Sequence, residues 1–328
     1  MQIVNKTKSA ILFILVISIT GCVTIDSTAT CENQSIIFTD AVTSAQKATL
    51  TVTPILPKST QTQLPPTPRN ETQVIKTSEI NGRVDVGGHQ IYLICVGAGT
   101  PAVILEAGYG STSDTWYLVQ PEVAKFARVC AYDRAGLGRS SAAPEPENSL
   151  QVVQELRALL DKAGIEKPYI LVGHALGGMY MRLFAERYPE DVVGLILVDS
   201  FHIDALSRNA EVLPTESPDE SESLKFYRDW FTNPPDYPAM KKELFEAGSL
   251  GDLPLVVLTS PEKERADDLP AGLSAKFDEI WVELQGDWAK ISSRSTHIIA
   301  EGSGHFIQEE QPDLVIDVIH QVLEGVRQ

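Results

Sequence analysis

Short apolar runs alternate with helical segments along most of the chain, and this alternation restricts the accessible folds more than any other feature of the sequence. Each run is rich in β-branched residues and apolar at successive positions, as strands are when both faces of their sheet are covered. A chain of this kind has to bury a sheet between two layers of helices. The strands predicted from these runs cover residues 80–86, 90–96, 102–106, 128–132, 169–172, 195–198, 255–258 and 297–300.

The segments between the strands have the spacing of amphipathic helices. In residues 149–163, Val152, Leu156 and Leu159 recur at helical intervals, and Gly164 follows as a stop signal. The first two strands flank a pair of glycines and are predicted to form a hairpin. Two antiparallel strands followed by strand–helix repeats predict the α/β class, with a mostly parallel, eight-stranded, doubly wound sheet.

One segment interrupts this rhythm after the sixth strand. Residues 201–250 contain no buried strand and are rich in Pro, Ser, Asp and Glu, with aromatic residues among them. We expect a helical lid inserted here; the alternative is a surface excursion with a small hydrophobic cluster of its own. The whole folded domain is predicted to cover residues 76–328.

The N-terminus has the pattern of an export signal. Lys6 and Lys8 precede an apolar stretch at 10–19 that is too short to span a bilayer comfortably, which predicts a signal peptide over residues 1–22. Its end, ITGC, resembles a bacterial lipobox. This resemblance implies lipid attachment at Cys22 and a membrane-anchored, extracytoplasmic lipoprotein of the cell envelope. Ordinary secretion and an uncleaved membrane helix are the alternatives.

Residues 23–75 are rich in Thr, Pro, Ser and Gln and show no periodic apolar face. Such a composition cannot bury enough apolar surface to fold, and its proline-rich part favours extended backbone. We predict a disordered tether that holds the domain away from a membrane.

Charge and cysteine content exclude several classes of function. Acidic residues number 44 against 27 Lys and Arg, for a net charge of −17, so a phosphate backbone would be repelled and no nucleic acid is expected. Cys95 and Cys130 lie in apolar strand-like runs; two buried free thiols are the favoured interpretation, with a disulfide between them as the alternative. We find no metal-ligand spacing and no dinucleotide fingerprint, and expect neither metal nor cofactor.

The most informative stretch is GHALG at 173–177, where a predicted strand runs through a tight turn into a helix. Glycines two residues before and after Ala175 would hold the central residue in strained backbone. This is the G-x-S-x-G nucleophile elbow with alanine in place of serine. The helix that follows, predicted over 179–188, would stabilise negative charge at its N-terminus.

Three further motifs lie at the ends of predicted strands: EAGYG at 106–110, YDRAGLGRS at 132–140 and EGSGHF at 301–306. With these motifs in this order, the chain resembles the α/β-hydrolase superfamily from about residue 76 to its end. The resemblance implies an oxyanion hole formed by the backbone N–H groups of Tyr109 and Leu176. It also implies that His305 is the general base.

The acid of the expected triad is open between two positions. We favour Asp199, at the end of the sixth strand, over Glu262, which follows the seventh strand, where the superfamily usually places its acid. The substrate pocket is expected near Gly108, His174 and Trp230, between the sheet edge and the lid.

Ala175 leaves three interpretations. In the first, the chain is a serine-type hydrolase for an ester-like small molecule, with an apolar acyl group, and it has lost its nucleophile. In the second, it is a non-catalytic protein that binds a ligand in the same pocket. In the third, His305 and Asp199 form a dyad for lyase or cofactor-independent oxygenase chemistry.

Overall fold

The computed structural model describes residues 79–143, 148–233, 248–261 and 267–328, all in one compact unit of the chain. The predicted signal peptide, lipidation site at Cys22 and tether lie outside the described residues, and so does Glu262. No helix in the described part is long and apolar enough to cross a bilayer.

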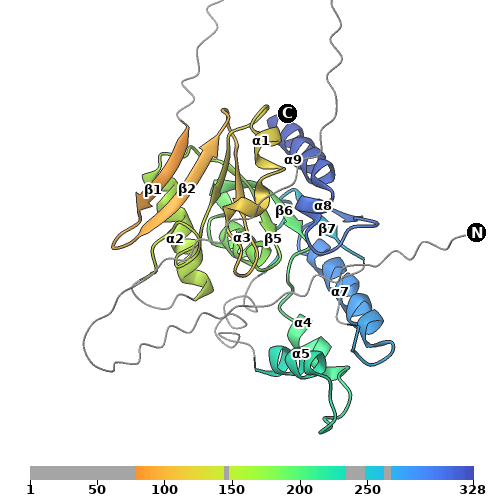
Figure 1. Ribbon diagram of the computed structural model, residues 1–328. Helices are drawn as coiled ribbons and strands as arrows, with labels where there is room; N and C mark the ends of the chain where they lie inside the picture. Colours follow the sequence, from red (N-terminus) through yellow and green to blue (C-terminus); the bar gives the residue numbers. More distant parts are fainter. Residues whose placement is uncertain (1–78, 144–147, 234–247, 262–266) are drawn as a thin grey trace, which may run out of the picture. The chain divides into compact units, whose positions relative to one another are not determined.

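The strands of the described residues form one eight-stranded sheet with the order β1-β2-β4-β3-β5-β6-β7-β8 (Figure 1). β1 pairs antiparallel with β2, and β2 with β4, whereas the other neighbours are parallel. The predicted fold class is therefore confirmed. The strands are β1 (Ile80–Asp85), β2 (Gln90–Val96), β3 (Ala102–Glu106), β4 (Val129–Tyr132), β5 (Tyr169–His174), β6 (Val192–Val198), β7 (Leu255–Thr259) and β8 (Ser295–Ile299).

Helices cover both faces of the sheet (Figure 1). One hydrophobic core joins the sheet to α2 (Ser149–Lys162) and α3 (Leu176–Arg187), and a second core on the other face joins it to α1 (Gln120–Val123) and α9 (Pro312–Arg327). Because both faces are buried, the central strands are apolar at nearly every position before their last residue, which is the pattern that made them recognisable in the sequence. The short α8 (Ile307–Glu310) precedes α9.

Helix α2 begins and ends at its sequence signals. The Asn148 side chain accepts a hydrogen bond from the N–H of Gln151, and the Gln151 side chain accepts one from the N–H of Asn148. The two bonds form a capping box. At the other end Gly164 has a positive φ of 67°, a backbone conformation that glycine adopts without strain.

The segment between β6 and β7 contains α4 (Ala205–Glu211) and α5 (Glu222–Thr232), which lie beside α7 (Leu273–Ala289) at one end of the molecule (Figure 1). Leu224 of α5 is buried against Leu273 and Phe277 of α7 in a small hydrophobic cluster. The described part of the predicted lid segment thus contains two helices, and it shares a small hydrophobic cluster with α7.

The two cysteines of the domain are joined. Cys95 of β2 and Cys130 of β4 are register partners, are fully buried and form a disulfide. The favoured prediction of two free thiols is therefore wrong. The pairing of β2 with β4, which places these residues opposite each other, skips β3 in the sequence and is not visible in a local pattern.

Candidate active site

Ala175 stands at the turn between β5 and α3 in a backbone conformation that side-chain-bearing residues rarely adopt. Its φ is 49° and its ψ is −121°. Its N–H donates to the carbonyl of Val198 at 3.1 Å, and its carbonyl accepts from the N–H groups of Gly178 at 3.1 Å and Phe201 at 2.9 Å. These bonds to α3 and to the turn after β6 hold the strained turn in place.

The glycines around the turn are required by close approach of the chain. A side chain on Gly173 would bring its Cβ within 2.5 Å of the Cα of Gly178, and one on Gly177 within 2.4 Å of the carbonyl oxygen of Ala107. The strand, the helix and the loop after β3 can pack this tightly only without side chains at these positions.

Asp199 and His305 form a hydrogen-bonded pair. The carboxylate of Asp199 is fully buried at the end of β6, and its Oδ2 lies 2.6 Å from Nδ1 of His305. Its Oδ1 accepts hydrogen bonds from the backbone N–H of Ser260 at 3.0 Å and from Nε1 of Trp281 at 2.7 Å. Three hydrogen bonds on one carboxylate fix its orientation.

His305 lies in the turn between β8 and α8, and one third of its side chain is exposed. With Nδ1 donating to Asp199, the neutral ring carries its proton there, and Nε2 is the basic nitrogen. The ring contacts that of His174, the residue before Ala175, with centroids 4.6 Å apart. Nε2 of His174 also bonds to the carbonyl of His305 at 2.9 Å. His174 therefore joins the His305 turn to the Ala175 turn.

The loop after β3 lies beside Ala175. A Cβ added to Gly108 would be 3.1 Å from Nδ1 of His174 and 3.2 Å from the Cβ of Ala175. Leu176 is the first residue of α3, so its N–H is one of those without a partner within the helix. The structure thus brings Gly108, His174, Ala175 and Leu176 together.

A buried carboxyl group, Glu106, lies behind this loop and was not singled out by the sequence analysis. It is fully buried and accepts hydrogen bonds from the Tyr132 hydroxyl and the Arg134 guanidinium. Burial raises the pKa of Glu106 to about 7, against the lowering effect of Arg134. An acidic residue at the end of an apolar strand was the available signal for this cluster.

The neighbouring Asp133 holds the next part of the same loop. It accepts bonds from the N–H and hydroxyl of Ser113, at 2.8 and 2.6 Å, and from Nε of Arg139 at 2.9 Å. Burial acts to raise the pKa of Asp133, but the hydrogen bonds from Arg139 and Ser113 outweigh it and the pKa is lowered. Asp133 and Arg134, adjacent in the turn after β4, therefore both bind the loop after β3.

Aromatic side chains connect this loop to α5. Tyr109 is 61% exposed, and its ring makes an edge contact with Trp230 at a centroid distance of 5.8 Å. Trp230 in turn stacks on Phe226, one turn away on α5. The predicted pocket residue Trp230 thus lies beside the loop that contacts Ala175.

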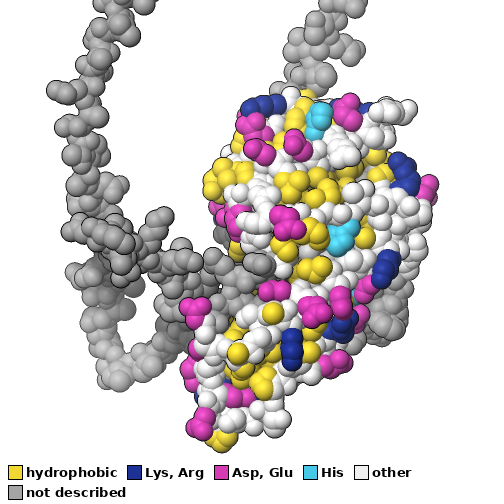
Figure 2. Space-filling view, turned by 90° about the vertical axis from the view of Figure 1, so that its right-hand side faces the viewer, with side chains coloured by type: hydrophobic (Ala, Val, Ile, Leu, Met, Phe, Trp, Pro, Cys, Tyr) yellow, Lys and Arg dark blue, Asp and Glu magenta, His cyan; other side chains and the backbone are white. Residues whose placement is uncertain are grey.

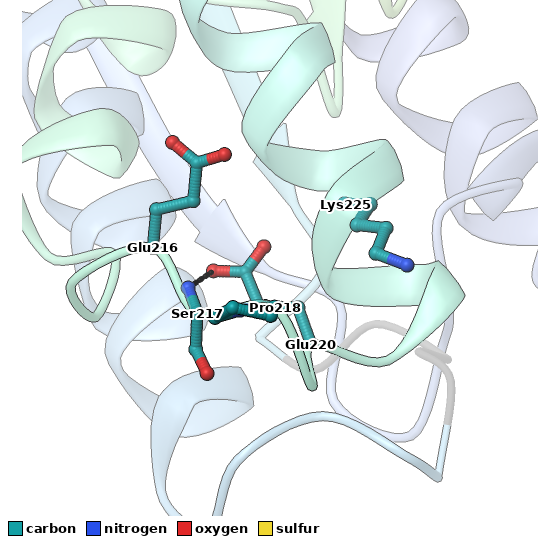
Figure 3. Close-up of a pocket in the computed structure, with 5 residues that line it drawn as sticks. All are labelled: Glu216, Ser217, Pro218, Glu220 and Lys225. Atoms are coloured by element: carbon teal, nitrogen blue, oxygen red, sulfur yellow. Dashed lines mark hydrogen bonds between the residues drawn. The ribbon is translucent and has the colours of Figure 1, made fainter.

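Two other observations concern ligands. A surface hollow of about 450 Å³ lies at the start of α5 and is lined by Glu216, Ser217, Pro218, Glu220 and Lys225, none of which belongs to the Ala175 site (Figure 3). Within the described ranges, no group of three or more His, Cys, Asp or Glu side chains could hold a metal ion.

Acidic side chains are spread over the face that carries α7 and α9, with apolar ones showing between them (Figure 2).

Comparison with known proteins gives the same fold. Among solved structures, a probable hydrolytic enzyme from Pseudomonas aeruginosa matches with a TM-score of 0.56 and 19% identity, over 75% of this chain and 95% of that one. A thermophilic esterase from Thermogutta terrifontis matches with a TM-score of 0.52 and 20% identity, over 77% of this chain and all of that one.

Sequence relatives agree with this result. YqjL of Bacillus subtilis is 28% identical over 69% of this chain and 85% of its own length, and an AB hydrolase superfamily protein of Gibberella zeae is 25% identical over 69% and 87%. The probable transporter efuK of Hormonema carpetanum is 26% identical, but the chain covers only 42% of it. The model of the alpha/beta hydrolase fold family matches residues 101–268, just over half of the chain. This protein belongs to the α/β hydrolase fold family.

Proposed function

We propose that this protein is a hydrolase of the serine type, built to act on an ester-like small molecule, and that Ala175 leaves it without its nucleophile. The observation that carries the proposal is the 2.6 Å hydrogen bond between Oδ2 of Asp199 and Nδ1 of His305. The ring of His305 also contacts that of His174, the residue before Ala175. A base held by a buried acid next to an elbow turn is the arrangement that activates a hydroxyl nucleophile.

With serine at position 175, the expected reaction is acyl transfer. Nε2 of His305 would take the hydroxyl proton while the oxygen attacks the carbonyl carbon, and Asp199 would stabilise the imidazolium that forms. The same proton would then pass to the leaving alcohol, and water would release the acid in a second round. A methyl group offers no oxygen for the first step, and loss of a triad nucleophile costs on the order of 10⁶ in kcat.

The oxyanion formed by this attack needs donors, and the loop after β3 is well placed to supply one. Arg134 binds the carbonyl of Gly108 at 2.6 Å. Because a trans peptide is planar, the N–H of Tyr109, in the same peptide, points away from Arg134. This direction and the proximity of Gly108 to Ala175 support Tyr109 N–H and Leu176 N–H as the two donors.

The acyl group is proposed to be small to medium and apolar. Its place would be beside Tyr109 and Trp230, whose rings are in contact at one edge of the site. In this proposal α4 and α5 act as the lid, and water is displaced from the site when the apolar substrate enters.

The test is to restore the nucleophile. We expect Ala175→Ser to hydrolyse p-nitrophenyl acetate and butyrate, with kcat at least 10³-fold above that of the unchanged chain. Ala175→Ser/His305→Ala and Ala175→Ser/Asp199→Asn should lose most of this gain. A folded serine variant that shows no ester hydrolysis would overturn the proposal, and the ligand-binding interpretation would then be tested by ligand screening on the unchanged chain.

We propose further that the protein is exported and anchored through a lipid on Cys22. The signal-like residues 1–22 motivate this proposal. The disulfide between Cys95 and Cys130 supports it, because disulfides persist in oxidising compartments and are rare in reducing ones.

A further inference from the structure

No side chain of the buried cluster of Glu106, Tyr132 and Arg134 takes part in the bond-making or proton-transfer steps described above. Glu106 is fully buried, and Arg134 is 7% exposed. Replacing a buried ion pair by well-packed apolar residues is often neutral or stabilising, so stability alone is a weak reason for it. The position of the cluster suggests another role.

The guanidinium of Arg134 binds three acceptors at once. One nitrogen, Nη1, donates to the Glu106 carboxylate and to the carbonyl of Ala107 at 2.7 Å; the other, Nη2, donates to the carbonyl of Gly108 at 2.6 Å. The planar fork of arginine can do this in one fixed geometry, whereas the single ammonium of lysine cannot. Two successive peptides of the loop are therefore held by one side chain.

Holding these carbonyls also sets the direction of two N–H groups. The carbonyls of Ala107 and Gly108 belong to the peptides that carry the N–H groups of Gly108 and Tyr109. A rotation of either peptide would break its bond to Arg134 and turn its N–H away from the site. A donor to an oxyanion is effective only when it is already oriented before the charge forms.

Glu106 is also packed against the elbow. A Cβ on Gly177 would lie 2.6 Å from the Cγ of Glu106 and 2.4 Å from the carbonyl oxygen of Ala107. The Glu106 side chain thus lies against the first turn of α3. The loop after β3 and the turn at Ala175 share this one contact surface, so the cluster sets the position of both relative to each other.

We propose that Arg134 and Glu106 are positioning residues for the oxyanion hole. Arg134 fixes the peptides of Gly108 and Tyr109, and Glu106 fixes Arg134. The inference rests on the proposed function, since it assigns the loop to a developing oxyanion. Neither side chain touches the substrate in this role, so their effect falls on the transition state rather than on substrate binding.

The first measurement uses the full chain with Ala175 unchanged. Backbone ¹⁵N order parameters of Gly108 and Tyr109 are compared among the unchanged protein, Arg134→Lys, Glu106→Gln and a control, Arg128→Lys. Arg128, just before β4, is also nearly buried and donates to a backbone carbonyl, that of Gly97 at 3.2 Å. We expect values of about 0.85 in the unchanged protein and the control, and below about 0.6 in Arg134→Lys.

The second measurement repeats the variants on Ala175→Ser. Removal of one oxyanion donor typically costs about 10²–10³ in kcat. We expect a decrease of about 100-fold for Arg134→Lys and about tenfold for Glu106→Gln, which retains a neutral hydrogen bond to Arg134. KM should stay within about threefold, and Arg128→Lys should leave both constants unchanged.

The outcomes separate the two proposals. Order parameters that stay high in both Arg134→Lys and Glu106→Gln would overturn the positioning role whatever the activity. Mobile amides with an unchanged kcat on an active Ala175→Ser background would overturn it too. Mobile amides with an inactive Ala175→Ser would leave Arg134 and Glu106 as the residues that fix the loop, and would show that the hydrolase proposal is what failed.

Discussion

Ala175 has a strained backbone conformation, although its methyl side chain has no reactive atom to present. A residue with φ of 49° and ψ of −121° costs of order 1–3 kcal/mol and persists only when its surroundings impose it. Here the surroundings are bonds from Gly178 and Phe201 to its carbonyl. Asp199, also at a strand end, has a φ of 44°. Backbone strain of this kind is common at active sites, and here it is present at both Ala175 and Asp199.

The strain can be measured by removing the side chain. Ala175→Gly should raise the free energy of unfolding by about 1 kcal/mol, because glycine adopts positive φ without cost and this gain exceeds its entropy penalty. Urea denaturation of Ala185→Gly is the matched control: Ala185 is buried inside α3, where glycine should lower the same free energy by about 1 kcal/mol. Equal destabilisation by both changes would contradict the presence of strain at Ala175.

At the scale of elements, the acid of the site depends on a helix far away in sequence. Asp199 ends β6, but one of its oxygens is bound by Trp281, on the third turn of α7. The Trp281 ring also lies edge-on to His305, at a centroid distance of 6.3 Å. Helix α7 thus contacts both members of the Asp199–His305 pair through Trp281, and the packing of α4 and α5 on α7 connects the predicted lid to the same helix.

Trp281→Phe, made on the Ala175→Ser background, tests this support. Phenylalanine keeps most of the ring packing but removes Nε1–H, so Oδ1 of Asp199 retains only the Ser260 N–H of the two donors described above. We expect kcat for p-nitrophenyl butyrate to fall about tenfold, which is less than the roughly 10²–10⁴-fold of a general acid–base group because Asp199 and His305 both remain. Trp288→Phe on the same helix, whose Nε1 has no hydrogen-bond partner within the described residues, is the control and should stay within about twofold.

Only the parts of this site that produce a local sequence pattern could be predicted from the sequence. The strands are continuous apolar runs, and the elbow is marked by Gly173 and Gly177. Helix α3 begins directly after Ala175, three residues before the predicted start. The prediction began the helix late because Gly177 and Gly178 are poor helix formers, although close packing requires glycine at both positions. Trp281 reaches the site through a tertiary contact with a distant strand, so no local pattern marks its role, and the only local signal for Glu106 is its place at the end of an apolar strand.

At the scale of the whole molecule, the disulfide is the feature of the domain that bears on the export proposed above. A buried disulfide links β2 to β4, close to the edge of the sheet. Its surroundings are already well packed, so its main effect is to restrict the unfolded chain, by about 3–4 kcal/mol for a loop of this length. Such a bond contributes only where it can form and persist, which connects the fold of the domain to the export proposed from residues 1–22.

Changing Cys22 separates the three fates proposed for the N-terminus. In a bacterium that processes lipoproteins, the unchanged chain should fractionate with membranes, and its mature N-terminal peptide should carry the mass of a diacylated cysteine. We expect Cys22→Ser to leave the lipid off. A soluble extracytoplasmic product would follow if the signal is still cleaved. The control is Cys31→Ser, which changes a cysteine of the predicted tether and should behave like the unchanged chain. Membrane association of Cys22→Ser after a carbonate wash would instead indicate an uncleaved helix, and an unchanged chain found in the soluble extracytoplasmic fraction would indicate ordinary secretion. Wherever the exported protein is found, the Cys95–Cys130 bond should be fully formed, because compartments outside the cytoplasm are oxidising.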